Sequence, residues 1–454
     1  MHTSSEPTVG LYDCRLGADE QVERVRAGGV PVAVYGLGKM GLPLASVFAD
    51  VTGNVTGVDI DPGVVESVNA GASPVTGEPG LDELVEESVA TGALSATADI
   101  DAAARAARVH VVVVPTLVED GTPDLSNIRV TAERVGAGLT PGDLVCIEST
   151  VPPGTCRDVV DPILQAESDI GADEYGLAFC PERTASGRAL RDIRGAYPKI
   201  VGGRDEESGR AAGLLYGQIT DNEVRRVADA TTAECVKVFE GVYRDVNIAL
   251  ANELARLADE LGVDVREGIA EANTQPYCDI HRPGPGVGGH CIPYYPYFLI
   301  DSLDTETPLL RTARSVNEEM PAYTARTVID ELAAAGIDPA EATVGVLGIA
   351  YRPGVDETRE SPGLAVIESL HEAGVETVAF DPVVDLSECD VRSAPVSAFP
   401  DLGLDGAVLV TDHGEFTNLP WDSIDSGIVV DGRGTLDRTA HPSRLKILGD
   451  GQDG

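Results

Sequence analysis

Cys291 stands in a stretch rich in glycine and proline, Arg282-Pro-Gly-Pro-Gly-Val-Gly-Gly-His-Cys-Ile-Pro. Backbone amide groups of such a stretch could bind a phosphate or a developing oxyanion. The sequence has 8 cysteines at irregular intervals and no Cys-x-x-Cys pair, so neither a zinc site nor a thioredoxin-type motif is indicated. A lone cysteine is more often a small core residue than a nucleophile. Its surroundings therefore single out Cys291.

A second pattern with chemical potential is Gly36-Leu-Gly-Lys-Met-Gly41, which follows one predicted strand and begins a predicted helix at 42–51. Glycines at these positions let the backbone approach a pyrophosphate at the helix N-terminus. A carboxylate ends the next predicted strand, where it can accept hydrogen bonds from ribose hydroxyls and would repel a 2′-phosphate, which favours NAD over NADP. The alternative is a tight glycine turn that binds nothing. The cofactor-binding candidates here are Gly36, Gly38, Met40, Gly41 and Asp59.

The elements that must position these residues alternate short β-branched runs with amphipathic stretches, as in a parallel sheet covered by helices. The predicted strands form two series, 32–35, 55–59, 109–115, 144–148 and 177–180, then 343–349, 377–380, 407–410 and 428–431. We therefore expect an α/β fold with two Rossmann-like doubly wound domains joined by a long central helix.

That helix is predicted over 231–262, where apolar residues recur every three or four positions. At 1.5 Å per residue it would extend roughly 45 Å, more than a small domain can cover. Its exposed part is expected to pack on a second copy, which predicts a homodimer. The stretch 282–296 is expected to be an ordered loop between the domains, without regular structure.

Four segments follow from this organisation. They are a disordered lead-in at 1–30, an NAD-binding Rossmann domain at 31–225, a central helical dimerisation region with the cysteine loop at 226–325, and a C-terminal α/β domain at 326–450. The lead-in lacks a cationic start and an apolar block, so it does not resemble a secretion signal.

The composition excludes several classes of partner. Asp and Glu number 75 against 33 Lys and Arg, for a formal charge of −42, which would repel nucleic acid and anionic membranes. No apolar run is long enough to span a membrane. A surface this acidic, with lysines only at positions 39, 199, 237 and 446, resembles that of salt-adapted archaeal proteins. We expect a cytoplasmic protein with reduced cysteines and no metal.

Several further motifs occur in a fixed order: Ser149-Thr-Val-Pro-Pro-Gly-Thr155, Cys180-Pro-Glu-Arg183, the helix with Lys237, the cysteine loop and Tyr351-Arg-Pro-Gly-Val-Asp-Glu-Thr-Arg359. Together with the glycine fingerprint they resemble the UDP-glucose/GDP-mannose dehydrogenase family, from about residue 31 to the last predicted strand. Within the family, the cysteine loop and the residue sequence from Tyr243 to Leu254 are most similar to the UDP-N-acetylhexosamine branch.

The resemblance implies oxidation of a sugar C6 alcohol to a carboxylate by two NAD⁺, through a thiohemiacetal and a thioester on cysteine. Cys291 matches the nucleophile, Lys237 the lysine that stabilises the oxyanion, and Glu182 the carboxylate that manages a proton or water. The substrate implied is UDP-N-acetylmannosamine first, UDP-N-acetylglucosamine second, with UDP-glucose as the alternative.

The resemblance also implies that the C-terminal α/β domain at 326–450 binds the UDP-sugar, and it assigns binding residues. Thr116 and Thr150 match cofactor-contacting positions, and as isolated threonines they could equally be turn formers. Arg282, Arg352 and Arg359 match phosphate- and uridine-side positions, where guanidinium groups suit a diphosphate. The alternative is that they form ordinary surface ion pairs. The remaining candidates are Arg359 for the cofactor and Arg183, Arg282, Gly286, Gly288, Gly289 and Arg352 for the substrate.

Two residues depart from the family pattern. Gly241 stands where the family usually has an asparagine that helps hold the oxyanion, and Tyr295 stands where it has an aspartate that orders the catalytic water. Tyrosine cannot act as a carboxylate at neutral pH. Other groups could replace them, the reaction could stop short of the acid, or the chain could bind without turnover. We favour retained activity.

Two rival functions remain open on the sequence. A hydroxy-acid dehydrogenase shares the fingerprint and the lysine helix, but Cys291 and the second α/β domain argue against it. A regulatory protein that binds NAD or a nucleotide sugar is suggested by Gly241 and Tyr295.

Overall fold

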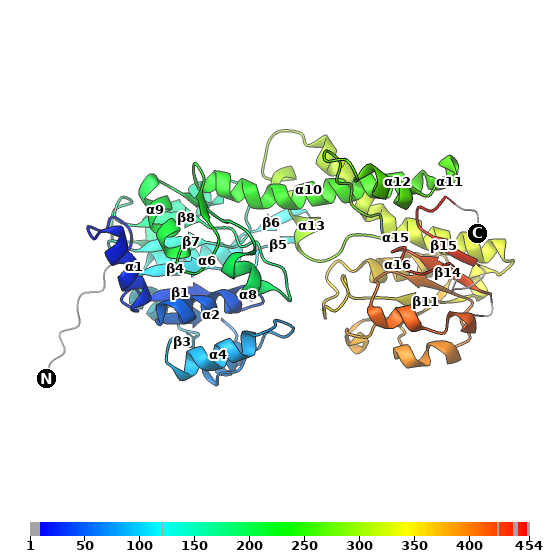
Figure 1. Ribbon diagram of the computed structural model, residues 1–454, viewed down its shortest axis with the longest axis horizontal. Coiled ribbons are helices and arrows are strands. Elements are labelled where there is room, and N and C mark those ends of the chain that lie inside the picture. Colours follow the sequence, from blue (N-terminus) through cyan, green and yellow to red (C-terminus); the bar gives the residue numbers. More distant parts are fainter. Residues whose placement is uncertain (1–9, 120, 425, 439–443, 452–454) are drawn as a thin grey trace. The chain divides into compact units, whose positions relative to one another are not determined.

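The computed structural model describes residues 10–119, 121–424, 426–438 and 444–451 (Figure 1). The chain divides into two compact units. Unit 1 comprises Met1–Phe239 with Tyr297–Ser302, and unit 2 comprises Glu240–Pro296 with Leu303–Gly454.

Unit 1 is built on an 8-stranded sheet in the order β10-β9-β8-β7-β4-β1-β2-β3, in which only the β8–β9 pair is antiparallel. The strands are β1 (Val32–Tyr35), β2 (Val55–Val58), β3 (Leu94–Thr97), β4 (Val109–Val112), β7 (Leu144–Ile147), β8 (Gly176–Phe179), β9 (Lys199–Gly203) and β10 (Val224–Arg226). A separate antiparallel hairpin pairs β5 (Leu117–Glu119) with β6 (Thr122–Asp124).

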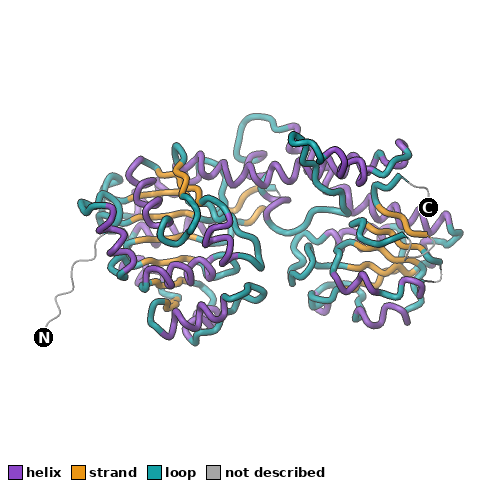
Figure 2. Tube along the Cα trace, viewed as in Figure 1, coloured by secondary structure: helices purple, strands orange, loops and turns teal. Residues whose placement is uncertain are grey.

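Both faces of this sheet are covered by helices, as Figure 2 shows for each unit. The helices of unit 1 are α1 (Ala18–Arg26), α2 (Gly41–Thr52), α3 (Pro62–Asn69), α4 (Leu81–Ala90), α5 (Ile100–Ala106), α6 (Ser126–Gly136), α7 (Asp161–Glu167), α8 (Ala189–Arg191), α9 (Glu206–Tyr216) and α14 (Tyr297–Ile300). Along β1, Val32 and Val34 join the core under α2 and α4, whereas Ala33 and Tyr35 join the core under α5 and α6. Burial on both faces explains why the strand is uniformly apolar.

Unit 2 repeats this architecture with a 5-stranded parallel sheet in the order β12-β11-β13-β14-β15. The strands are β11 (Thr343–Leu347), β12 (Glu376–Phe380), β13 (Gly406–Leu409), β14 (Ile428–Asp431) and β15 (Arg444–Ile447). The helices are α11 (Ala258–Leu261), α12 (Val265–Ala272), α13 (Cys291–Tyr294), α15 (Pro308–Ala334) and α16 (Pro362–Glu372). Helices α15 and α16 cover one face, and aromatic residues of short helical turns cover the other.

The long helix α10 (Ala230–Arg256) has 27 residues and belongs to both units, because the division falls after Phe239. Two Rossmann-like doubly wound domains and a long central helix therefore confirm the predicted fold class. The single helix expected over 231–262 is interrupted at Leu257, after which α11 ends at a left-handed Gly262.

Three expectations about elements differ from the structure. Part of the expected disordered lead-in is folded, since α1 lies within it and Leu11 and Val25 are buried in a core of unit 1. Residues 1–9 lie outside the described residues. The loop expected over 282–296 contains the helix α13, which begins at Cys291. Strands β3, β5, β6, β9, β10 and β15 were not predicted.

Candidate functional site

The turn between β1 and α2 has the geometry of a dinucleotide-binding turn. Gly36 has φ +95°, and a Cβ there would collide with the carbonyl oxygen of Val113. A Cβ on Gly41 would collide with the carbonyl oxygen of Gly36. Gly38, in contrast, is exposed and would have nothing within 4 Å of a Cβ. Two glycines thus build the turn, and the third leaves open space beside the backbone for a ligand.

Asp59 follows β2 and lies beside this turn. Its Oδ2 accepts a hydrogen bond from the Leu37 amide at 2.8 Å, and its Oδ1 accepts one from the Asp61 amide at 3.0 Å. A carboxylate has about four acceptor positions, so two remain for the hydroxyls of a ribose. The residues present fit the adenosine end of NAD.

Unit 2 also has a carboxylate at the corresponding place, but there hydrogen bonds from the protein itself occupy the carboxylate oxygens. Asp381 follows β12 and accepts hydrogen bonds at 2.8–2.9 Å from the backbone amides of Ile349, Ala350, Val383 and Val384. His413 Nε2 also lies 3.3 Å from its Oδ2. Burial raises the pKa of the Asp381 carboxyl, but hydrogen bonds from His413 and the backbone outweigh that effect and hold the pKa well below its usual range. This carboxylate stabilises the turn after β11 and has little capacity left for a ribose.

The other cofactor candidates of unit 1 are held near the same sheet edge. Thr116 is buried, and its hydroxyl donates to the carbonyl of Thr150 at 2.6 Å. The Met40 sulfur accepts from the Thr184 hydroxyl at 2.9 Å, which brings the glycine turn beside the segment that follows β8. The Thr116 hydroxyl thus ties the two segments together through the Thr150 backbone, and contact of either threonine with a cofactor stays a prediction.

Glu182 and Lys237 face each other within unit 1. Lys237 Nζ lies 3.8 Å from Glu182 Oε2, and the side chains are only 9% and 15% exposed. The other carboxylate oxygen, Oε1, accepts a hydrogen bond from the Thr184 amide. Lys237 is therefore a buried cation paired with a carboxylate and not an ordinary surface lysine.

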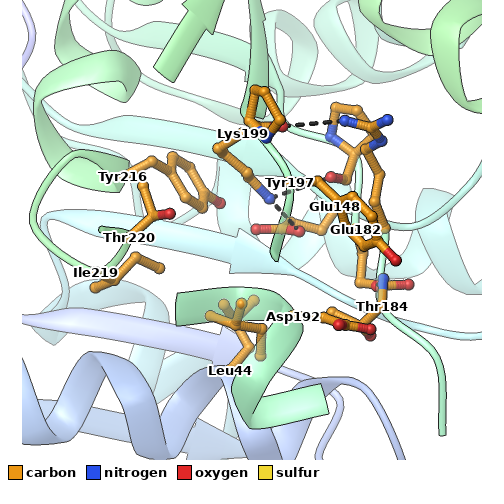
Figure 3. A pocket seen from close by; sticks show the side chains of 14 residues that line it. Leu44, Glu148, Glu182, Thr184, Asp192, Tyr197, Lys199, Tyr216, Ile219 and Thr220 are labelled. Carbon is orange, nitrogen blue, oxygen red and sulfur yellow. Dashed lines mark hydrogen bonds and ion pairs between the residues drawn. The ribbon is translucent and has the colours of Figure 1, made fainter. Parts of the chain in front are cut away.

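Arg183 lies with Glu182 in the lining of a cavity between the segment after β8 and the start of β9 (Figure 3). Its Nη1 donates to the carbonyl of Pro198 at 3.0 Å, and its guanidinium carbon lies 5.7 Å from the centre of the Tyr197 ring. The arginine is fixed by these contacts, and a role in substrate binding stays a prediction.

Cys291 differs from the other cysteines in its surroundings. Of the 8, all within the described residues, it is the exposed one, whereas Cys146, Cys156 and Cys180 are buried. Burial raises the pKa of the Cys156 and Cys180 thiols well above the usual value, which keeps them protonated and unreactive. Cys291 is the first residue of α13, so its thiol is accessible to a reagent or substrate.

The glycines of the cysteine loop allow close packing within unit 2. A Cβ on Gly288 would lie 2.9 Å from Tyr351 Cβ, and one on Gly289 would lie 2.8 Å from the Tyr351 ring. A Cβ on Gly286 would lie 3.0 Å from Pro362. From the sequence we predicted that backbone amides of this loop could bind a phosphate or an oxyanion. Their observed role is to seat the loop on the turn between Tyr351 and Pro362.

This packing brings the predicted arginine turn and the cysteine loop together. The Gly289 amide donates to the carbonyl of Arg359 at 2.9 Å, and the Tyr294 hydroxyl donates to Glu360 at 3.1 Å. The guanidinium carbon of Arg352 lies 6.0 Å from the centre of the Tyr351 ring. Arg282, at the start of the loop, is exposed. The two motifs were expected in separate domains, but they lie in one unit.

Three polar residues that hold the cysteine loop were not predicted, and one of them, Asn252, is fully buried. Asn252 of α10 accepts from the Gly284 amide at 2.9 Å, and Asn247 accepts from the His281 amide at 2.7 Å. Arg266 of α12 donates to the carbonyls of Pro283, Gly432, Arg433 and Leu448 at 2.9–3.3 Å. The available signal was the position of Asn252 among apolar residues of the helix, because a buried amide requires partners.

The two departures from the family pattern contact each other. The Tyr295 ring lies on Gly241, where an added Cβ would approach Tyr295 Cβ to 2.9 Å and collide with the ring. Tyr295 is 5% exposed, and its amide donates to the carbonyl of Cys291 at 3.1 Å. A side chain at position 241 is therefore incompatible with this position of Tyr295.

The predicted site residues form two sets, one in each unit. Unit 1 holds Gly36, Gly38, Met40, Gly41, Asp59, Thr116, Thr150, Glu182, Arg183 and Lys237. Unit 2 holds Arg282, Gly286, Gly288, Gly289, Cys291, Arg352 and Arg359. In the part of the chain that the structure describes, no group of three or more His, Cys, Asp or Glu is arranged to hold a metal ion.

Comparison with protein families defines the class. The NAD binding domain of the UDP-glucose/GDP-mannose dehydrogenase family matches residues 30–220, its central domain matches 231–319, and its UDP binding domain matches 345–438. The chain belongs to the UDP-glucose/GDP-mannose dehydrogenase family.

Individual relatives narrow the comparison. The chain is 37% identical to UDP-N-acetyl-D-mannosamine dehydrogenase of Pyrococcus horikoshii over 89% of its length and 96% of the relative. It is 35% identical to NDP-N-acetyl-D-galactosaminuronic acid dehydrogenase of Ralstonia solanacearum over 89% and 95%. The solved structure of UDP-D-ManNAc dehydrogenase from Pyrococcus horikoshii superposes with a TM-score of 0.86, covering 93% of this chain and 100% of that one, at 35% identity.

The chain is thus an NAD-dependent oxidoreductase of the nucleotide-sugar dehydrogenase class, and its UDP binding domain indicates a UDP-sugar substrate. Membership in this family, across all three of its domains, decides against a hydroxy-acid dehydrogenase. Among the described residues, no helix combines the length and the apolar character that crossing a bilayer requires.

Proposed function

We propose that this protein oxidises the C6 alcohol of a UDP-N-acetylhexosamine, with UDP-N-acetylmannosamine as first choice, to the corresponding uronate. The observation that carries the proposal is Cys291, the exposed cysteine of a loop seated on the Tyr351–Pro362 turn. The relatives named for N-acetylated sugars support the substrate class.

Cys291 makes the second oxidation possible. Loss of a hydride and a proton from the C6 alcohol gives an aldehyde, and the Cys291 thiolate adds to its carbon, so that a C–S bond forms and the oxygen takes a proton. Loss of a second hydride and of that proton gives a thioester. Water then attacks the thioester, the C–S bond breaks, the thiolate returns and the carboxylate is released.

Lys237 is assigned to stabilise the oxyanion, and Glu182 is assigned to transfer a proton or activate water. The Lys237 ammonium suits a developing oxyanion, because it is a buried cation that needs no reorganisation to face a negative charge. Glu182 suits the proton and water work of hydrolysis. The exposed fraction and mutual distance of this pair support both assignments.

NAD⁺, when bound, supplies the hydride acceptor for both oxidations. The open space beside Gly38 and the free acceptor positions of Asp59 would hold its pyrophosphate and adenosine ribose. Thr116, Thr150 and Arg359 are the further cofactor contacts, and Arg183, Arg282 and Arg352 bind the substrate diphosphate and uridine.

The assembly proposed is a homodimer formed through the central helix. Tyr243 and Leu250 of α10 are 51% and 47% exposed, and Leu257 and Leu261 beyond it are 42% and 59% exposed. A contiguous apolar helical stripe of this kind is typical of an interface. The cytoplasm of a salt-adapted archaeon is the location that the acidic composition favours, and glycan biosynthesis is the use of the product.

The direct test measures NADH from UDP-N-acetylmannosamine, UDP-N-acetylglucosamine and UDP-glucose in molar salt. We expect two NADH and one uronate per UDP-N-acetylhexosamine consumed. If only UDP-glucose gave NADH, UDP-glucose would be the substrate in place of a UDP-N-acetylhexosamine. If no UDP-sugar gave NADH, the proposed activity would be refuted.

A second candidate function has one observation in its favour. Gly241 stands in place of the family's asparagine and Tyr295 in place of its aspartate, and the Tyr295 ring occupies the space over Gly241. A homologue that binds NAD and nucleotide sugars without completing the reaction is consistent with this change. Binding of both ligands in calorimetry without NADH formation selects that function.

A further inference from the structure

Lys199, a residue outside every motif considered so far, joins the segments around Glu182. It is the first residue of β9, and its Nζ donates to Glu148 Oε2 at 2.9 Å, to the Cys180 carbonyl at 2.8 Å and to the Pro181 carbonyl at 3.2 Å. An ammonium has three hydrogens, so all its donors are used. In Figure 3 the ammonium lies between Glu148 and the Tyr216 ring, whose centre is 4.4 Å away.

The ion pair between Lys199 and Glu148 carries a desolvation cost. Glu148 is 1% exposed, and its Oε2 accepts a hydrogen bond from the Lys199 ammonium. Burial raises the pKa of Glu148, and the Lys199 ammonium opposes that shift. A buried charge pair seldom adds net stability, although removing one partner is strongly destabilising. The Lys199 side chain, 17% exposed, is therefore expected to have a purpose other than stability alone.

The two carbonyls that Lys199 binds immediately precede Glu182. Pro181 has a fixed φ, so holding the carbonyls on both of its sides leaves little freedom for the backbone that carries the Glu182 side chain. On the far side, the Thr184 amide donates to the Glu182 carboxylate. The carboxylate that faces Lys237 at 3.8 Å is thus aimed by contacts before and after it.

We propose that Lys199 is the positioning residue for Glu182. It contacts neither the reacting atoms nor Lys237. It fixes the Cys180–Pro181 backbone and thereby the direction of the Glu182 carboxylate, with Glu148 as its counter-ion. This role rests on the proposed function, in which Glu182 handles a proton or water.

The test compares wild type with Lys199→Met, Glu148→Gln and the double variant Lys199→Met/Glu148→Gln. Lys199→Met alone leaves a buried carboxylate without its cation and is expected to lower the melting temperature. The double variant removes both charges, so its melting temperature should recover, while the bonds to the two carbonyls stay lost. Lys446→Met is the matched control, because the Lys446 side chain is 10% exposed, is paired with a carboxylate, Asp259 at 2.8 Å, and belongs to unit 2.

The readouts are kcat with the UDP-sugar, KM for NAD⁺, the pH profile of kcat and hydrogen exchange of the Thr184 amide. In the double variant we expect kcat to fall about tenfold or more, because small displacements of a reacting group have effects of this size. The acidic limb of the pH profile should shift, KM for NAD⁺ should hold, and protection of the Thr184 amide should be lost. Lys446→Met should match wild type in all four.

Recovery of kcat together with melting temperature in the double variant would overturn the positioning role, as would unchanged protection of Thr184. Absence of turnover in wild type would refute the proposed function and with it the purpose of the positioning. Hydrogen exchange in that case still reports whether Lys199 aims the Glu182 carboxylate, so the two failures are distinguishable.

Discussion

Burial separates the cysteines of this chain into groups with different chemistry. Three are buried, four are partly buried, and Cys291 is exposed at the start of α13. The loop setting and the family resemblance identified Cys291 from sequence. The contact between Gly241 and Tyr295 could not be predicted in the same way, because the two residues are far apart in sequence and neither type indicates a partner. The loop contact of Arg266 escaped prediction for the same reason, whereas Asn252 could have been suspected from its position among apolar residues of α10.

Cys291→Ser should abolish formation of the uronate, because a serine hydroxyl at neutral pH is a far weaker nucleophile than a thiolate. We expect a loss in kcat of several orders of magnitude for complete oxidation, measured as NADH per uronate. Cys389→Ser, at a partly buried cysteine whose thiol pKa is raised by burial, is the control and should retain turnover.

Gly241→Ala should destabilise the protein by about 1–3 kcal/mol, since the added Cβ overpacks against the Tyr295 ring. Gly268→Ala is the matched control, because Gly268 also lies in a helix of unit 2 but has nothing within 4 Å of a Cβ. That control should stabilise by about 0.5–1 kcal/mol through helix propensity. Chemical unfolding measures both. Equal effects would show that the Tyr295 contact is unimportant.

At the scale of elements, the strands easiest to predict are those buried on both faces. β1 and β7 are apolar throughout for this reason, and such a run is visible in sequence. β10 (Val-Arg-Arg) and β15 (Arg-Leu-Lys-Ile) carry charges and lie at the ends of their sheets, where exposure permits polar residues. The end of α10 at Arg256 was missed because apolar spacing continues through Leu257 and Leu261.

The β1–α2 turn predicts different effects for two of its glycines. Gly41→Ala should disrupt folding, because the Cβ collides with the Gly36 carbonyl. Gly38→Ala should preserve the melting temperature and weaken NAD⁺ binding by tenfold or more, since the methyl group enters open space that a pyrophosphate would approach. Calorimetry with NAD⁺ provides the measurement. Unchanged affinity in Gly38→Ala would argue against a cofactor at this turn.

The turn after β11 predicts a dependence on pH. The pKa of Asp381 is lowered in the folded protein, so its contribution to stability is full above the unfolded pKa of about 4 and decreases as pH falls below that value. We expect Asp381→Asn to destabilise the protein at pH 7 and to flatten the decline in unfolding free energy toward pH 3. A decline as steep as in wild type would contradict this assignment.

The molecule as a whole combines a charge of −42 with an apolar helical stripe. Its fold class, two doubly wound domains and a long helix, could be predicted because the strand pattern occurs twice with the helical period between. The grouping of the cysteine loop with the Tyr351–Pro362 turn in one unit could not, since it depends on glycine-mediated packing between segments about sixty residues apart. Self-repulsion at this charge is reduced by salt.

The stripe on α10 and α11 predicts an interface. Leu250→Glu combined with Leu257→Glu should shift the protein from dimer to monomer in sedimentation at molar salt, because burying two carboxylates in an apolar contact is unfavourable. Val130→Glu, at an apolar residue of α6 that is 54% exposed, is the control and should leave the dimer intact. A wild-type monomer at micromolar concentration would refute the interface.

The central claim concerns a reaction with a fixed stoichiometry. The most direct measurement is the amount of NADH and of uronate formed from a known amount of UDP-N-acetylmannosamine in molar salt, in wild type and in Cys291→Ser. The account predicts two NADH and one uronate per sugar for wild type and no uronate for the variant. One NADH per sugar with an aldehyde product, or uronate formation by Cys291→Ser, would contradict it.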